Sequence, residues 1–425
     1  MKYDTVVIGA GLGGLMAALS AAERGKKTLV VSRGMGIITI FSGTIDILGY
    51  YPVQDTAPLS SPREGVERLI SEDPKHPYAR VGVEALEKGM SFFQEAVARE
   101  GVTYVGNLDR NFLVPTAVGT IKPTAFLSKR MEAGDVREES DVLIAGFRGL
   151  KDFYPAYMAH NISTSTVPGV SIPHFRGRVL DVDIGADGSG MSALTLARKM
   201  EEDAMIQAIG RALFCQVRDG ERIALPAVLG IRGGDEVFRR LEDMAGTRIF
   251  ETPTLPPSVT GYRLYRALES RVRASGIRLL IGYDVHDPEI RGGRVAAVNI
   301  SMGKKTKRIE GDTFVLATGG LVGRGIITDR KSTLEPIFGL PVSGPSRRNE
   351  WFAERFFDPS GHPINKIGLE VDDRLRPTGD GKKHVYENLF ACGAELAGYA
   401  ALREKSGGGV TIASGFKAGR LAGEL

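Results

Sequence analysis

Three glycines near the start of the chain have the spacing of a phosphate-binding turn. Gly9, Gly11 and Gly14 form the pattern G-x-G-x-x-G. In such a turn the first glycine permits a tight bend, the second lets the backbone approach a pyrophosphate, and the third lets helix and strand pack closely. The free N–H groups at the start of the next helix face the phosphates. These residues therefore predict a dinucleotide-binding turn.

The elements around this turn come in the order that such a unit requires. Residues 5–8 are apolar and β-branched and predict a strand, residues 15–24 predict a helix that ends before Gly25, and residues 28–31 predict a second strand. A strand, a glycine turn, a helix and a second strand in this order are far more specific than the glycines alone.

Ser32 and Arg33 stand at the end of the second strand, where an acidic residue usually binds a ribose. A carboxylate would accept both hydroxyl protons with charge assistance, whereas serine makes only a neutral hydrogen bond. Three explanations stay open. The ribose of FAD is held more weakly, or the cofactor is FMN and has no adenosine, or Arg33 binds the 2′-phosphate of NADP.

Further candidate cofactor residues lie in two later segments. Ser42, Gly43 and Thr44 follow the second strand in a glycine-rich loop that suits the phosphates and ring of a cofactor. The segment 312–320, "DTFVLATGG", predicts a strand whose end at Thr318 and Gly319 is small enough to lie against a dinucleotide.

The C-terminal segment supplies a third signal. Gly393 ends a short strand, and Gly408, Gly409 and Val410 stand at the start of a helix of small residues that runs to Leu421. The dipole of such a helix would stabilise negative charge on a reduced flavin. A plain NADP domain does not need this C-terminal return to the cofactor, so the three signals together favour a flavin.

The catalytic residues are less clear. His174, Arg176, Arg263 and Arg324 are weak candidates, because a histidine can accept a proton and arginines suit an anionic substrate or cofactor. The sequence has no Ser/His/Asp arrangement and no metal-ligand spacing, so we predict no metal and name no catalytic base.

Length and composition predict two domains. The chain has 425 residues, of which 42% are hydrophobic. We expect a flavin-binding domain of residues 1–55 and 250–425, with an inserted cap or substrate domain of residues 56–249. The strands and helices of residues 142–245 predict that this insertion is α/β, and residues 192–213 predict one long helix within it.

Charge and cysteine content exclude several classes of function. The net charge is +4, but acidic and basic residues are interleaved, so we expect no nucleic-acid binding. The two cysteines, Cys215 and Cys392, are far apart, which disfavours an iron–sulfur or zinc site and suits the cytoplasm. No apolar run reaches the roughly 20 residues of a membrane span, so we expect membrane contact only through a partner.

The chain resembles the flavoproteins with two dinucleotide-binding domains, on the side of succinate dehydrogenase and fumarate reductase. It is most similar to the B-subunit family of anaerobic glycerol-3-phosphate dehydrogenase. The matching segments are "VVSRG", "FSGTIDILG", "PTLPPSVTGYRL", "ATGGLVGRGI", "LEPIFGLPV", "LRPTGDG" and "NLFACGAEL" with "SGGGVTIASGFKAG". The resemblance implies a Rossmann-like α/β flavoprotein fold with an inserted cap. It also accounts for Ser32 and Arg33, because this family lacks the acidic residue.

The resemblance also implies cofactor, reaction and partners. It implies FMN, with FAD as a close alternative. It implies oxidation of sn-glycerol 3-phosphate to dihydroxyacetone phosphate, with electrons passed to quinone at the inner face of the membrane. One implied partner is a larger flavin subunit, and the other is an iron–sulfur subunit. Two alternatives remain: the chain is an electron-relay or scaffold subunit without catalytic activity, or it is an NADP-dependent reductase.

Overall fold

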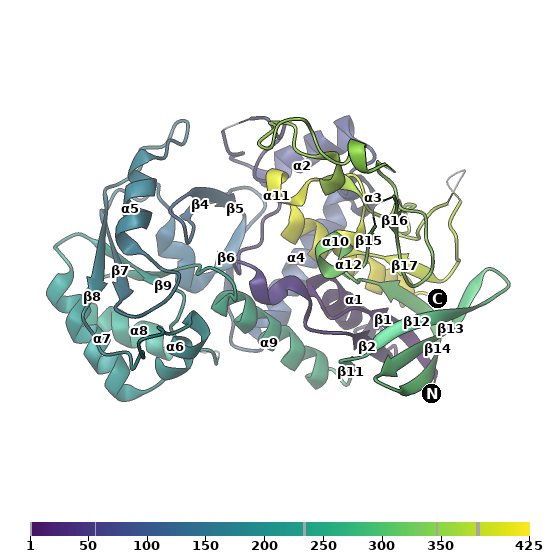
Figure 1. Cartoon of the computed structure of the whole chain (residues 1–425), viewed down its shortest axis with the longest axis horizontal. Helices are drawn as coiled ribbons and strands as arrows, with labels where there is room; N and C mark the ends of the chain where they lie inside the picture. The colour runs from purple at the N-terminus through teal and green to yellow at the C-terminus, as the bar shows by residue number, and fades with distance from the viewer. Residues whose placement is uncertain (1, 56, 233–234, 330, 346, 380–382) are drawn as a thin grey trace.

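The computed structural model describes residues 2–55, 57–232, 235–329, 331–345, 347–379 and 383–425. Two sheets with helices packed against them lie side by side along the long axis of the molecule (Figure 1). This arrangement confirms the predicted α/β class. The first and last elements, β1 and α12, both lie in the unit that contains the glycine turn.

The first sheet has seven strands in the order β11-β2-β1-β14-β13-β12, with β17 paired to β14. The strands that flank the glycine turn are parallel, and Ile8 of β1 pairs with Val31 of β2 and with Leu316 of β14. Their carboxyl ends therefore meet at one edge, which is where α/β folds bind ligands. The strands are β1 (Lys2–Ile8), β2 (Thr28–Ser32), β11 (Arg278–Ile281), β12 (Asp284–Arg291), β13 (Arg294–Met302), β14 (Lys305–Leu316) and β17 (Leu389–Ala391).

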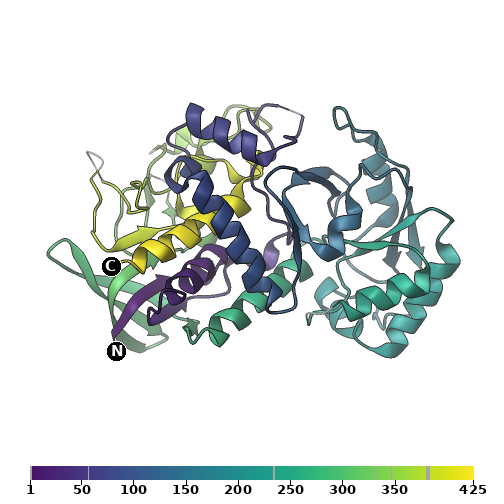
Figure 2. The ribbon, with the colours of Figure 1, turned by 180° about the vertical axis from the view of Figure 1, so that it is seen from behind.

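Helices α1 (Leu12–Ala22) and α12 (Gly407–Ala422) pack on one face of this sheet, and α4 (Val83–Ala98) packs on α12 outside them. Figure 2 shows α12 lying between α1 and α4. Small residues permit the close approach. A Cβ atom on Gly415 would lie 2.4 Å from the carbonyl oxygen of Gly13, and one on Gly419 would lie 2.2 Å from that of Ala17.

The second sheet has four parallel strands in the order β10-β9-β7-β8, shown at the left of Figure 1. They are β7 (Val142–Phe147), β8 (Phe175–Leu180), β9 (Arg222–Pro226) and β10 (Ile249–Thr252). Its helices are α5 (Pro155–Thr164), α6 (Ala193–Lys199), α7 (Asp203–Gln216) and α8 (Glu236–Ala245).

The prediction of one long helix over residues 192–213 was wrong, because the chain forms α6 and α7 with a break between them. The side chain of Glu201 in this break accepts hydrogen bonds from the amides of Ile231 and Arg232 at 2.9 and 3.0 Å. A contact with a distant loop therefore fixes the break, which helical periodicity does not report.

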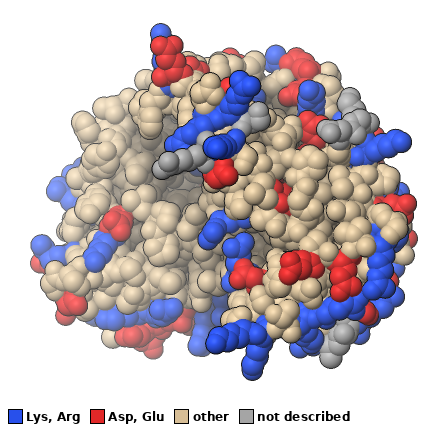
Figure 3. Space-filling view, turned by 45° about the vertical axis from the view of Figure 1, so that its right-hand side comes forward, with Lys and Arg blue, Asp and Glu red and all other residues tan. Residues whose placement is uncertain are grey.

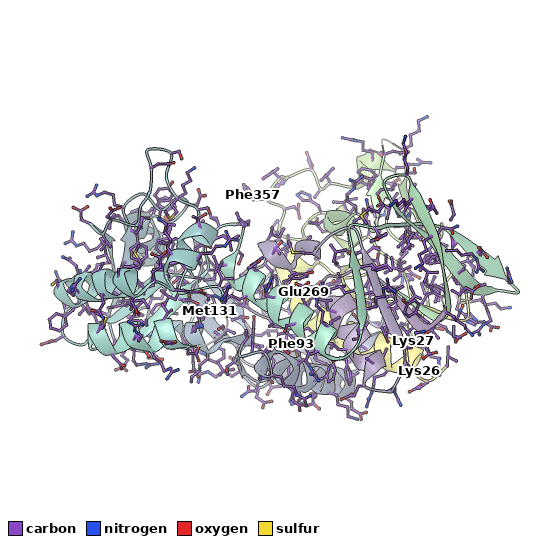
Figure 4. The ribbon with its side chains drawn as sticks, turned by 90° about the horizontal axis from the view of Figure 1, so that it is seen from below. Lys26, Lys27, Phe93, Met131, Glu269 and Phe357 are labelled. Carbon is purple, nitrogen blue, oxygen red and sulfur yellow. The ribbon has the colours of Figure 1, made fainter. Side chains whose placement is uncertain are left out.

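Each sheet has its own hydrophobic core. The first core includes Val66, Leu69 and Phe93, although the predicted boundary at residue 56 assigns them to the insertion. The predicted division into residues 1–55 with 250–425 and residues 56–249 stays a prediction. Figure 4 shows Phe93 of α4 in the first unit and Met131 between the two units, where Met131 joins a small buried cluster with Leu127.

The remaining elements connect or flank these two units. They are α2 (Pro62–Glu72), α3 (Pro77–Val81), β3 (Tyr104–Gly106), β4 (Phe112–Pro115), β5 (Ile121–Thr124), β6 (Phe126–Ser128), α9 (Val259–Ala274), α10 (Gly320–Gly323), β15 (Ile327–Thr328), β16 (Thr333–Leu334) and α11 (Ala401–Glu404), with 3-10 turns at Gly36–Ile40, Lys129–Gly134, Arg348–Glu350, Pro363–Lys366 and Gly393–Glu395.

The close packing of α12 on α1 predicts that a single methyl group added at their interface changes the stability of the protein. A glycine-to-alanine change inside a helix normally stabilises it by about 1 kcal/mol. At Gly419 the added Cβ collides with a backbone oxygen that cannot move away independently, so we expect Gly419→Ala to destabilise the protein by roughly 1–3 kcal/mol. Urea denaturation measures the change. Gly188→Ala is the control, because a Cβ there meets no atom within 4 Å, and equal midpoints for the two variants would contradict the packing argument.

Candidate flavin site

Gly9 and Gly14 hold the first turn of the site together. Gly9 has a φ of +118°, and a Cβ atom on it would lie 2.1 Å from the carbonyl oxygen of Ala317 at the end of β14. A Cβ atom on Gly14 would lie 2.0 Å from the carbonyl oxygen of Gly9. Both glycines are therefore required by packing of strand, turn and helix.

Gly11 differs from its two neighbours in the motif because it borders open space. A Cβ atom built there meets no atom within 4 Å, and its φ of −76° does not require glycine. Gly11 is also the residue that precedes α1, whose first N–H groups are free to bind an anion. The turn thus has room for a phosphate at the place where the motif predicts one.

Ser32 and Arg33 both have partners within the chain. The hydroxyl of Ser32 donates to the carbonyl of Gly34 at 2.7 Å. Arg33 forms an ion pair of 3.0 Å with Asp284, and both side chains are about half exposed. The charge of Arg33 is therefore partly compensated and screened by water, which does not favour a dedicated 2′-phosphate site.

The loop that contains Ser42, Gly43 and Thr44 is clamped from two sides. Gly43 has a φ of +79°, and its carbonyl accepts a hydrogen bond of 2.5 Å from the hydroxyl of Tyr104 in β3. The hydroxyl of Thr260 in α9 donates to the carbonyl of Ser42 at 2.7 Å. Ser42 and Thr44 also lie 2.9 Å apart through their hydroxyl oxygens. These hydrogen bonds therefore hold the loop in place within the unit that contains the glycine turn.

The ends of β14 and β17 meet near the N-terminal part of α12. The amide of Gly393 donates to the hydroxyl of Ser414 at 2.9 Å, and Gly319 has a φ of +92°. The hydroxyl of Thr318 donates to the carboxyl of Glu395. The structure therefore brings the predicted segments around residues 318 and 393 together.

Glu395 is a buried carboxyl beside Thr318 that the sequence analysis did not single out. Its side chain is fully buried, and its Oε2 atom has no hydrogen-bond partner in the part of the chain that the structure describes. Burial raises the pKa of Glu395 well above its ordinary value, and the nearby charge of Glu335 raises it further. Burial of Glu395 thus favours the protonated form of its carboxyl over the ionised form. The only sequence signal was an acidic residue inside the apolar segment "FACGAEL".

The residues at the start of α12 have a packing role in the structure. The amide of Gly409 donates to the carbonyl of Asp46 at 2.9 Å, and a Cβ atom on Gly408 would lie 3.0 Å from the amide nitrogen of Asp46. Val410 is fully buried. Residues 45–47 thus cover the first turn of α12, and contact of this turn with a flavin ring stays a prediction.

The four weak catalytic candidates do not form one cluster. His174 precedes β8 and Arg176 lies in it, at the outer edge of the second sheet (Figure 1), where Arg176 pairs with Glu221 at 2.5 Å. Arg263 is buried, and its guanidinium donates to both carboxylate oxygens of Glu251. Arg263 is therefore committed to a structural ion pair.

Arg324 is the candidate that remains open to a ligand. Its side chain is exposed, and it forms no ion pair with any residue that the structure describes. It follows α10 directly after the "ATGG" turn and has a φ of +64°, which non-glycine residues rarely adopt.

The fold and this site define a flavoprotein with a Rossmann-like dinucleotide-binding fold. In agreement, the family described as "FAD binding domain" matches residues 4–410. The B subunit of the probable anaerobic glycerol-3-phosphate dehydrogenase of Halobacterium salinarum is 36% identical to this chain, over 100% of this chain and 98% of that protein. The B subunit of the anaerobic glycerol-3-phosphate dehydrogenase of Vibrio cholerae is 30% identical, over 98% of this chain and 96% of that protein. The chain therefore belongs to the B-subunit family of anaerobic glycerol-3-phosphate dehydrogenase.

Solved structures give a more distant comparison. A chain of Escherichia coli quinol fumarate reductase is 11% identical, with a TM-score of 0.45, over 100% of this chain and 70% of that chain. A 3-ketosteroid delta1-dehydrogenase of Sterolibacterium denitrificans is 11% identical, with a TM-score of 0.44, over 100% of both chains.

The open space at Gly11 predicts how flavin binding can be blocked. We expect Gly11→Leu to lower the flavin content of the purified protein at least roughly tenfold, because the new side chain fills the space that a phosphate needs. The thermal midpoint of the flavin-free protein should stay within a few degrees of the wild type. Release of flavin by acid and chromatography measures the content. Gly188→Leu is the control, and full flavin content in Gly11→Leu would place the cofactor elsewhere.

The raised pKa of Glu395 predicts a pH-dependent difference in stability. Such a group favours folding below its unfolded pKa of about 4.3, and this contribution is lost as the pH rises. Glu395→Gln removes the titration, so we expect its thermal midpoint to exceed that of the wild type more at pH 8.5 than at pH 5.

Glu404 is a matched control, because its pKa is shifted in the opposite direction to that of Glu395. Burial opposes its ionisation, but the charge of His76 and hydrogen bonds from His76, Ala400 and Ser406 together outweigh burial and lower the pKa of Glu404. Its contribution is therefore present at neutral pH and is lost in acid. Glu404→Gln should be less stable than the wild type at pH 8.5, and the same pH trend in both variants would refute the assignment for Glu395.

Proposed function

We propose that this chain is a flavin-dependent subunit of anaerobic glycerol-3-phosphate dehydrogenase. It takes part in oxidation of sn-glycerol 3-phosphate to dihydroxyacetone phosphate, and the electrons leave through partner subunits to quinone. The observation that carries the proposal is the 36% identity to a relative of that name over the whole of this chain. A bound flavin supplies the acceptor for the hydride that leaves the substrate carbon.

The residues of the site support a cofactor held without an acidic ribose contact. Ser32 stands where an acidic residue usually binds the ribose, and its hydroxyl donates to the carbonyl of Gly34, while the carboxylate of Asp284 near the end of β2 is paired with Arg33. This favours FMN, with FAD held by its pyrophosphate as the alternative. Gly11 and the start of α1 would hold the phosphate.

Cations around an open cavity support an anionic substrate. Lys331, Arg347, Arg348 and Asn349 line a cavity of about 660 Å³. Lys331, Arg347 and Arg348 form no ion pair with another residue among those that the structure describes. Figure 3 shows a hollow in this face of the molecule with basic side chains at its rim. The positive charges of these residues and of Arg324 would attract a phosphate-bearing substrate towards the unit that contains the glycine turn.

The relatives are named as subunits, so the chain belongs to a family whose members work in complexes of several subunits. We propose two partners in this complex, of which one is a larger flavin subunit, while the other is an iron–sulfur subunit. Within the described parts of the chain, no helix has the length and apolar character needed to cross a membrane. Membrane association would then come through a partner.

Anaerobic addition of sn-glycerol 3-phosphate tests the proposal. We expect the purified, flavin-loaded chain to lose the visible absorption of its oxidised flavin, because the substrate carbon gives up a hydride to it. Glycerol, which lacks the phosphate, is the control and should not react. Reduction only after the partner subunits are added would support the electron-relay alternative. A colourless protein that binds NADPH tightly and takes up neither flavin would refute the proposal.

A further inference from the structure

Two lysines and one aspartate lie together at the seam between the two units. Lys122 comes from β5, Asp46 from the loop after the turn at Gly36–Ile40, and Lys405 from the residue after α11. The side chains of Lys122 and Asp46 are only 14% and 12% exposed, and Lys405 is half-buried. Charged side chains are rarely buried to this extent unless they are paired with an opposite charge or a ligand, because burial opposes ionisation.

Lys122 is already bound to the loop that the sequence assigns to the cofactor. Its Nζ donates to Asp46 Oδ2 and to Thr44 Oγ1, both at 2.8 Å. These bonds link β5 to the rigid loop at Ser42–Thr44. An ammonium group has three protons, so Lys122 retains one for a ligand.

Lys405 has no comparable partner. Its Nζ makes no hydrogen bond and no ion pair with any of the residues that the structure describes, although burial and the charge of Lys122 both lower its pKa. Its backbone has a φ of +53°, a costly conformation for a side chain other than glycine. Gly49 makes space for it, because a Cβ atom on Gly49 would lie 2.8 Å from Lys405 Cβ and 2.6 Å from Pro123 Cγ.

The charges of this group do not balance. Asp46 supplies one negative charge against the two ammonium groups of Lys122 and Lys405, and like charges in a half-buried place repel each other. A bound anion would relieve this repulsion and would accept the free protons of both lysines. A phosphate monoester fits best, because its several oxygens can accept from both ammonium groups at once.

We infer that Lys122 and Lys405 bind the phosphate group of a phosphate monoester at the seam between the two units. The assignment of that monoester to the substrate rests on the proposed function. Thr44 connects the site to the loop expected at the flavin, so a small substrate held here by its phosphate would extend towards the cofactor.

Calorimetric titration of the full-length, flavin-loaded protein tests this inference. The probes are inorganic phosphate, sn-glycerol 3-phosphate and glycerol. We expect Lys405→Gln to weaken binding of both phosphate compounds by at least about tenfold, since a charge-assisted hydrogen bond is lost. Lys405→Arg should retain most of the affinity. Lys366→Gln, which changes an exposed lysine in the 3-10 turn at Pro363–Lys366, should bind as the wild type does.

The outcomes separate this inference from the proposed function. Equal phosphate affinity in the wild type and in Lys405→Gln would overturn the inference. Phosphate binding that depends on Lys405, in a protein whose flavin sn-glycerol 3-phosphate cannot reduce even with partners, would support the site and refute the proposed reaction. Loss of FMN from Lys405→Gln, with no phosphate binding to the loaded wild type, would support the site with the cofactor's phosphate as its ligand. Lys122→Gln provides a second test if Lys405→Gln fails to fold.

Discussion

The close contact between the turn at Gly9 and the end of β14 is the constraint on which the remainder of the structure depends. The carbonyl of Ala317 occupies the place where a side chain on Gly9 would be, and Gly14 approaches Gly9 in the same way from α1. Because these contacts fix β1, α1 and β14 together, the loops after three parallel strands converge at one edge. Of the three glycines in the motif, only Gly11 is left beside open space, so the same packing that closes the turn leaves room for one phosphate.

Charge follows from this geometry. The convergence of β14 and β17 buries Glu395 against Thr318, where burial raises the pKa of its carboxyl well above its ordinary value. At the seam between the two units, near the loop at Ser42–Thr44, Lys122 forms an ion pair with Asp46, and Lys405 lies close enough to both for their charges to act on it. The described structure thus has a buried carboxyl with a raised pKa in one place and two lysines beside one aspartate in another. The two lysines suit the anionic substrate that we propose.

Local patterns predicted the first βαβ unit well, because its spacing is contiguous in sequence. The predicted segments at residues 5–8, 15–24 and 28–31 correspond to β1, α1 and β2, and small-residue spacing correctly indicated the C-terminal helix. The helix over residues 192–213 was predicted wrongly because Glu201 is held by a loop about 30 residues away. Arg263 was ranked by its motif, but its partner Glu251 lies in the preceding strand and takes up its charge.

The amino-acid sequence alone was enough to establish the α/β class, the dinucleotide turn and the family, since these depend on residue types at fixed short spacings. It could not show that, among the described residues, Glu395 keeps an unpartnered carboxyl oxygen and Lys405 an unpartnered amine. Those properties depend on burial and on which groups come within hydrogen-bonding distance. Lys122 and Lys405 are far apart in the chain, and only the docking of β5 against the residues before α12 places their two charges together.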